Sequence, residues 1–211
     1  VKVDKSVLDE MKAETKKKID ILTDEIYELA GMEFNIASPK QLGEVLFEKL
    51  GLPGGKKGTK TYKTDVKVLN KLVNAHPIIK KILAYRNLSK IYSTYLEGLE
   101  TYIKKDDKIH TIFKQNYTRT GRLSSIEPNL QNIPARDEEG RKVRKAFLPV
   151  NDLILSVDYS QIELRLLAHI SKSEDLIKAF VNGEDIHTKV AADIHEIDEK
   201  EVTKSMRSTA K

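Results

Sequence analysis

Residues 153–165 read Leu-Ile-Leu-Ser-Val-Asp-Tyr-Ser-Gln-Ile-Glu-Leu-Arg. The mostly apolar run 153–157 predicts a buried strand that ends at Asp158, and a helix is expected from about residue 160 to 170. This order would place the Asp158 carboxylate at a sheet edge that faces solvent. Mg²⁺ prefers oxygen ligands and keeps positions for water and phosphate. The stretch therefore predicts a divalent-metal site at Asp158.

A positively charged helix face follows later in the chain. Lys204, Arg207 and Lys211 are spaced i, i+3 and i+7, so they share one face of a helix. An Arg fork and a Lys point charge suit a triphosphate. A metal-binding carboxylate together with such a face points to a nucleoside triphosphate. A plain solvated helix face is the alternative.

Each of the other site candidates also has an ordinary structural role open to it. Asp158 could be a common turn residue. Ser160 and Glu163 have the spacing of a capping box, which needs no further purpose. His187 follows the expected helix cap Asp185 and, taken alone, would be a surface histidine.

Composition sets broad limits on function. The 211 residues include 37 Lys and Arg against 32 Asp and Glu, a net charge of +5, which is weak evidence for a nucleic-acid partner. The absence of cysteine excludes disulfides, thiolate catalysis and zinc–thiolate sites. No apolar run approaches the roughly 18 residues of a membrane span. With no signal peptide and no initiator Met, we expect a soluble intracellular protein excised from a longer chain.

The first half of the chain predicts an antiparallel helical arm. Apolar residues at steps of three or four predict a long helix over 4–30 and a second long helix from Ile78 to about 103. Ser38-Pro39 marks another helix start, and Thr64 is expected to cap a short helix. A basic loop over 54–64 lies between them, so the arm would have a positive tip.

From residue 108 the residue composition becomes typical of strand and irregular loop. Residues 109–120 are rich in β-branched and aromatic side chains and predict a strand. A polar set surrounds the prolines that follow. Such side chains can contact sugar, phosphate or minor-groove acceptors, or they can satisfy their own loop backbone. The set comprises Arg119, Arg122, Asn129, Gln131, Asn132 and Arg136.

Several segments together resemble family A DNA polymerases, the bacterial DNA polymerase I type. Residues 118–125 (Thr-x-Thr-Gly-Arg-Leu-Ser-Ser) and 128–136 (Pro-Asn-Leu-Gln-Asn-Ile-Pro-x-Arg) match that family's palm. Residues 158–165 match its motif A, 185–188 (Asp-Ile-His-Thr) its early fingers, and 206–211 (Met-Arg-x-x-x-Lys) the opening of motif B. The matches follow in order and cover the whole chain.

The resemblance implies an α+β fold in three parts. Residues 1–106 would form a thumb-like helical arm, and residues 107–170 the first part of an antiparallel-sheet palm with motif A. Residues 171–211 would form the first helices of the fingers and end inside motif B. The implied function is template-directed DNA polymerisation, in which two Mg²⁺ ions assist nucleotidyl transfer from a dNTP to a primer 3′-hydroxyl.

The resemblance also implies roles for individual residues. Asp158, with the Tyr159 carbonyl, would ligate the metal ions, and Glu163 would crowd the ribose 2′ position. Asp158, Arg207 and Lys211 would be catalytic. The nucleotide would be bound by Gln161, Glu163, His187, Arg207 and Lys211. Primer-template DNA would be bound by Lys56, Lys57, Lys60, Tyr62, Thr64, Arg122, Asn129, Gln131, Asn132 and Arg136.

Two departures from the family pattern bear on activity. The family's second metal-binding Asp lies in a later motif C, and the rest of motif B follows Lys211. We therefore expect the 211-residue chain alone to be inactive or nearly so, with the remaining half of the domain as a continuation or a separate chain. The rival readings are a non-catalytic DNA-binding clamp and a single-subunit RNA polymerase. Glu163 argues against the RNA polymerase because it would exclude a ribonucleotide.

Overall fold

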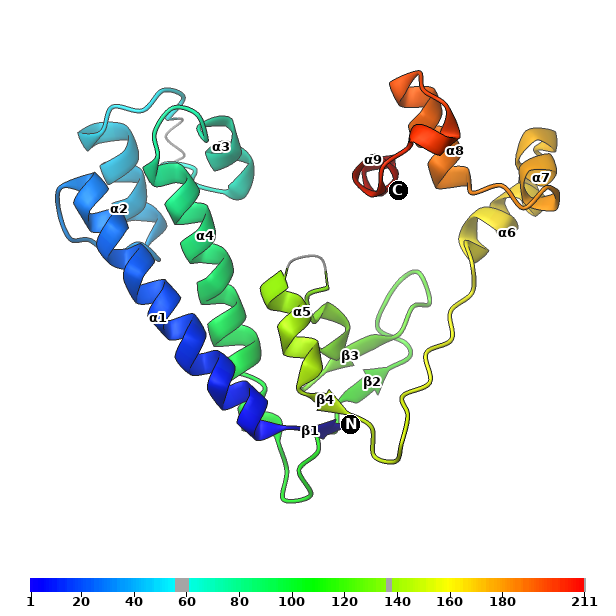
Figure 1. Ribbon diagram of the computed structural model, residues 1–211, viewed down its shortest axis with the longest axis horizontal. Coiled ribbons are helices and arrows are strands. Elements are labelled where there is room, and N and C mark those ends of the chain that lie inside the picture. Colours follow the sequence, from blue (N-terminus) through cyan, green and yellow to red (C-terminus); the bar gives the residue numbers. More distant parts are fainter. Residues whose placement is uncertain (56–60, 136–137, 211) are drawn as a thin grey trace. The chain divides into compact units, whose positions relative to one another are not determined.

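The computed structural model describes residues 1–55, 61–135 and 138–210 of the chain (Figure 1). It divides into two units, Val1–Ile154 and Leu155–Lys211. Helices dominate both units, and the short strands of the described residues pair antiparallel. The predicted α+β class is confirmed. Among the described residues, no helix combines the length and the apolar character needed to cross a membrane.

Two long helices form the predicted arm of the first unit. Helix α1 (Lys5–Ala30) is capped by the Asp4 side chain and ends at Gly31 in the left-handed conformation, φ 65°. It lies side by side and antiparallel with α4 (Ile78–Ile91) (Figure 1). The buried stripe of α1 has the expected helical spacing: Leu8, Met11, Thr15, Ile19, Ile26 and Ala30.

Shorter helices complete the arm at the end far from the N-terminal strand β1 (Lys2–Val3) (Figure 1). Helix α2 (Pro39–Gly43) begins at the predicted Ser38 cap and continues as a π-helix, η1 (Glu44–Lys49). Helix α3 (Val66–Lys71) starts at Asp65 and not at the predicted Thr64. The carboxylate of Asp65 accepts the Val68 N–H (3.1 Å), whereas Thr64 is buried and bonded to Arg86.

The second long helix is shorter than predicted. After α4 the backbone widens into a π-helix, η2 (Tyr92–Glu97), and then a 3-10 turn, η3 (Glu100–Tyr102). The Gly98 N–H bonds to the Ser93 carbonyl (3.1 Å), five residues back, which is the π-helical pattern. Regular α-helix therefore ends at Ile91 and does not reach residue 103.

Small antiparallel pairs and one helix follow the arm. Strand β1 (Lys2–Val3) pairs with β4 (Phe147–Leu148), and β2 (Ile112–Lys114) pairs with β3 (Ser124–Ile126). The strand predicted over 109–120 is thus formed only at β2, because the chain then turns back, with Gly121 at φ 75°. The 3-10 helix η4 (Leu130–Asn132) and helix α5 (Glu138–Lys145) lie between β3 and β4.

The predicted strand over 153–158 is not formed. In the part of the chain that the structure describes, no strand pairs with it, and its side chains are exposed. The exposed fraction is 87% for Leu153, 87% for Leu155 and 83% for Val157. Apolar content alone does not make a strand, because its backbone N–H and C=O groups need a partner ladder. Asp158 consequently lies on exposed extended chain and not at a sheet edge.

The second unit is a succession of helices: α6 (Ile162–Ser171), α7 (Glu174–Val181), α8 (Ile186–His195), η5 (Glu199–Glu201) and α9 (Lys204–Ala210). The predicted N-cap Asp185 is confirmed, and Asp198 caps η5 in the same way through the Lys200 N–H. Ser173 occupies the N-cap position of α7 but makes no side-chain hydrogen bond there. Helix α6 is capped by Gln161 in the left-handed conformation, φ 52°, without a side-chain hydrogen bond, so the predicted Ser160 cap is wrong.

Candidate functional site

Asp185 joins two of the predicted nucleotide-binding residues. Its Oδ1 accepts the backbone N–H groups of His187 (3.0 Å) and Thr188 (3.2 Å), which caps α8. Its Oδ2 accepts Nε (2.9 Å) and Nη2 (2.7 Å) of Arg207, on α9. Helices α8 and α9 pack together, so His187 and Arg207 belong to one bonded unit.

The electrostatics of Asp185 favour its charged form. Partial burial raises the pKa of its carboxyl, but hydrogen bonds from Arg207, Thr188 and His187 outweigh burial and leave the pKa below its usual value. The cap contributes about 1 kcal/mol to helix stability. Because the side chains of Arg207 and Asp185 are 40% and 38% exposed, their ion pair adds at most about 1 kcal/mol.

The rest of the positive face of α9 is only partly described. Lys204 is exposed at the start of the helix. Lys211, a predicted catalytic residue, lies outside the described residues. The observed part of the face therefore consists of Lys204 and Arg207.

The motif A residues lie where the exposed chain enters α6. Asp158 and Tyr159 are exposed, and no hydrogen bond or ion pair within the described ranges joins Asp158 to α8 or α9. Arg165 fixes the entry to α6: its Nε donates to the Ser160 carbonyl (3.0 Å), and its guanidinium lies 4.6 Å from the centre of the Phe180 ring. The side-chain Oε1 of Gln161 is buried and has no hydrogen-bond partner among the described residues. We have no structural explanation for this unpaired oxygen.

The donor set for a metal ion is incomplete in the described part of the chain. No three His, Cys, Asp or Glu side chains converge there. Asp158 is an exposed carboxylate that could supply one oxygen ligand, and the Tyr159 carbonyl could supply a second. These two groups fit part of a Mg²⁺ site but do not form a cage by themselves.

Two predicted DNA-binding residues of the arm have internal partners. The Tyr62 hydroxyl donates to Glu48 Oε1 (3.1 Å), and its ring packs on Phe47 with centroids 5.1 Å apart. The Thr64 hydroxyl accepts from Arg86 Nη2 (3.1 Å). Both side chains therefore hold the arm together, and their contact with DNA stays a prediction. The predicted residues Lys56, Lys57 and Lys60 lie outside the described residues.

The loop amides satisfy their own backbone in two cases. Asn129 Oδ1 accepts the Gln131 N–H (3.0 Å), and Gln131 itself bridges to the Leu123 carbonyl (3.2 Å) and the Ser125 N–H (3.2 Å). The backbone carbonyl of Asn132 accepts a hydrogen bond from the Tyr95 hydroxyl, so this bond does not use the Asn132 side chain. Arg122 is exposed, and Arg136 lies outside the described residues.

The sequence did not predict the bonds made by two arginines, or the ion pair between Asp185 and Arg207. Arg86 binds Thr64, and Arg144 donates to the carbonyls of Pro134 (3.1 Å) and Ile133 (3.2 Å). The link between Asp185 and Arg207 spans 22 residues. No spacing rule signals such a pair, although an Asp cap next to a predicted ligand could have prompted the search.

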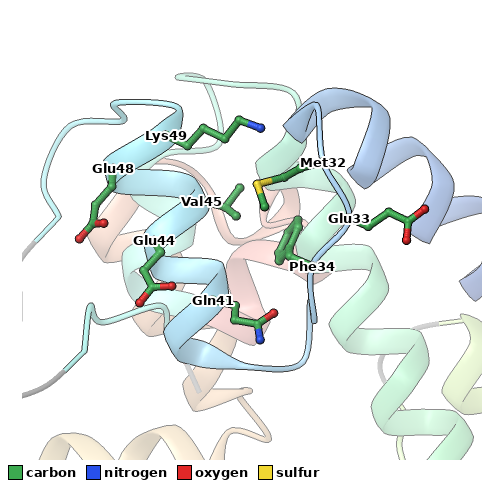
Figure 2. Close-up of a pocket in the computed structure, with 8 residues that line it drawn as sticks. All are labelled: Met32, Glu33, Phe34, Gln41, Glu44, Val45, Glu48 and Lys49. Carbon is green, nitrogen blue, oxygen red and sulfur yellow. The ribbon is translucent and has the colours of Figure 1, made fainter.

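A cavity of about 590 Å³ lies on the arm between the chain that follows α1 and the α2–η1 helix (Figure 2). It has an apolar floor and three glutamates around it, so it does not suit a phosphate. Among the described residues, none of the predicted site residues lines it. The lining residues are Met32, Glu33, Phe34, Gln41, Glu44, Val45, Glu48 and Lys49.

Comparison with known proteins identifies the family. The model of DNA polymerase family A matches residues 5–211. The chain belongs to DNA polymerase family A. The resemblance seen in the motifs is thereby confirmed over nearly the whole chain.

Curated relatives and a solved structure agree with this family assignment. The chain is 56% identical to DNA polymerase I of Lactococcus lactis subsp. cremoris and 55% identical to that of Geobacillus stearothermophilus, covering 100% of this chain and 24% of each relative. The POL domain of Pol1 from M. smegmatis, in complex with DNA primer-template and dNTP, aligns with a TM-score of 0.86 at 38% identity, covering 100% of this chain and 38% of that one. The chain thus spans about a quarter of the length of these curated family A relatives.

Proposed function

We propose that this sequence supplies the thumb, the first part of the palm and the first fingers helices of a template-directed DNA polymerase. The reaction would be nucleotidyl transfer from a dNTP to a primer 3′-hydroxyl, with release of pyrophosphate. The observation that carries the proposal is the bonded unit of His187, Asp185 and Arg207 in a family A chain that also contains motif A. We call the polypeptide that joins this sequence to the remaining segments of a family A polymerase domain the parent polymerase.

The nucleotide would be bound through its triphosphate by His187, Arg207 and Lys211. Two of the N–H donors of Arg207 are engaged by Asp185, so three remain for phosphate oxygens. Fixed cationic donors stabilise the charge that develops on a phosphate during transfer, and this is the main service of a protein in such chemistry.

Motif A would supply one side of the metal site. Family A polymerases generally use divalent metal ions. Asp158 and the Tyr159 carbonyl would hold Mg²⁺, and the exposure of both residues leaves them accessible to it. Bound ions would activate the attacking hydroxyl and neutralise the leaving group. A further carboxylate from outside this chain would complete the ligand set.

Primer-template DNA would lie along the arm and the loops that follow it. Arg122 is exposed, and the sequence of 54–64 contributes four further Lys residues whose charge would attract the DNA backbone. The amide side chains of Asn129 and Gln131 would contribute indirectly, by fixing the loop between β3 and α5. We also place the parent polymerase in the cytoplasm, at the nucleoid, because the relatives are bacterial DNA polymerases I.

Primer extension tests the proposal directly. With Mg²⁺, all four dNTPs and a primed template, the purified parent polymerase is expected to extend the primer. The 211-residue chain alone is expected to give no measurable extension, because one motif A carboxylate cannot form the metal site. A parent polymerase that binds the duplex without extending it would be a clamp, and the proposal would be wrong.

Ribonucleotide exclusion tests the role of Glu163. Replacing Glu163 with Ala in the parent polymerase is expected to raise the ratio of ribonucleotide to deoxynucleotide incorporation on the order of tenfold, because space opens at the ribose 2′ position. Single-nucleotide incorporation with rNTP and dNTP measures the ratio. Glu174→Ala, at an exposed position in the first turn of α7, is the control. An unchanged ratio would leave Glu163 with a structural role only.

A further inference from the structure

The two oxygens of Asp185 serve different helices. Oδ1 is bonded to the backbone at the start of α8, whereas Oδ2 is bonded, among the residues that the structure describes, only to the guanidinium of Arg207. Within the described ranges Asp185 is the one side chain that bonds to Arg207. The carboxylate therefore fixes a long, flexible side chain relative to a helix that it also caps.

The geometry leaves one edge of the guanidinium open. Asp185 engages Nε and Nη2, at 2.9 and 2.7 Å, so both Nη1 donors and one Nη2 donor stay free of it. Those two nitrogens form the edge that suits two phosphate oxygens at once. The carboxylate cannot follow or leave Arg207 easily, because its other oxygen holds the N–H groups of His187 and Thr188.

We propose that Asp185 is a positioning residue for the incoming nucleotide: it holds Arg207 beside the start of α8 so that Arg207 and His187 bind the same polyphosphate. This inference rests on the proposed function. Fixing the side chain before the nucleotide arrives removes an ordering cost from binding. The opposite role, in which Asp185 competes with phosphate for Arg207, predicts tighter nucleotide binding when the charge is removed.

Asp185→Asn in the parent polymerase separates these roles. Asparagine caps a helix about as well as aspartate, but it lacks the charge that holds Arg207. We expect the KM for dNTP and the Kd of a non-hydrolysable dNTP analogue to rise about tenfold, with kcat changed less than about threefold. Asp185→Ser, which also retains a cap, is expected to give the same result.

Matched controls make the test specific. Asp198→Asn alters another N-cap aspartate of the same unit, whose carboxylate accepts the Lys200 N–H (2.9 Å), and should leave the KM unchanged. In an Arg207→Ala background, Asp185→Asn should raise the KM no further, because its effect passes through Arg207. Circular dichroism should show the same helix content in every variant.

Four outcomes would overturn the inference. The first three are an unchanged KM in both cap-retaining variants, a lowered KM in either variant, and a further rise in KM when Asp185→Asn is added to Arg207→Ala. Loss of helix content in Asp185→Asn and Asp185→Ser alike would also overturn it, since the carboxylate would then be needed for folding. If the unmodified parent polymerase fails to extend a primer, the proposed function itself fails, and this result is distinct from all four.

Discussion

Replacing Asp158 with Ala in the parent polymerase is expected to lower the rate of primer extension by on the order of 1,000-fold or more, because metal-assisted phosphoryl transfer loses a ligand. Binding of the primer-template duplex should change little, since Asp158 carries negative charge and DNA affinity comes from cationic contacts to phosphate. Single-turnover extension and a fluorescence-anisotropy titration with labelled duplex measure the two quantities.

The chain offers a close control for this substitution. Asp152 lies on the same exposed segment, six residues earlier, and Asp152→Ala removes the same charge from the same region. It should extend primers at close to the normal rate. If duplex binding by Asp158→Ala falls as far as turnover does, or if Asp152→Ala is equally impaired, Asp158 has no special role as a metal ligand.

Local signals were sufficient for the helices of the arm and of the second unit. Helix α1 follows its apolar spacing from the Asp4 cap to Gly31, and Ser38 and Asp185 start helices as their side chains predict. In each case the decisive contacts lie within a few residues of one another. At the adjacent candidates Thr64 and Asp65 the choice of Thr64 was wrong, although aspartate is the stronger N-cap: Asp65 caps α3, and Thr64 bonds to Arg86 on another helix.

Predictions that depended on a distant partner were less secure. The run 153–157 has the composition of a buried strand, yet its side chains are exposed because no described strand pairs with it. Helix α6 starts at Gln161 in a left-handed conformation, which no propensity favours for glutamine. The position of the Gln131 side chain likewise follows from bonds to Leu123 and to Ser125 on β3 that the sequence does not display.

The candidate site divides in the same way. The identities of Asp158, His187 and Arg207 followed from motifs, since each motif is a short segment with a fixed spacing. That Asp185 bonds to Arg207 did not follow, because α8 and α9 must first pack together to bring the two side chains within 2.7 Å. Motifs thus nominate candidate nucleotide-binding groups, while packing decides how those groups are held.

Arg207→Ala in the parent polymerase is expected to lower kcat/KM for dNTP by on the order of 100-fold, because a fixed cationic donor to the triphosphate is lost. The kcat/KM of Arg207→Lys should lie between the values of Arg207→Ala and of the unmodified parent polymerase. Lysine retains the charge, but it lacks the planar guanidinium that can bind Asp185 and two phosphate oxygens at the same time. Steady-state single-nucleotide incorporation over a range of dNTP concentrations measures both variants.

Lys204→Ala is the control that separates a bonded donor from general positive charge. Lys204 is exposed on α9, three residues before Arg207, and its loss lowers the charge of the same face by the same amount. Within the described ranges it has no bond to Asp185, so kcat/KM should fall less than about threefold, as expected for screened surface charge. Equal losses in Lys204→Ala and Arg207→Ala would mean that α9 attracts the nucleotide only by its field. The orientation of the guanidinium against Asp185 would then have no part in binding.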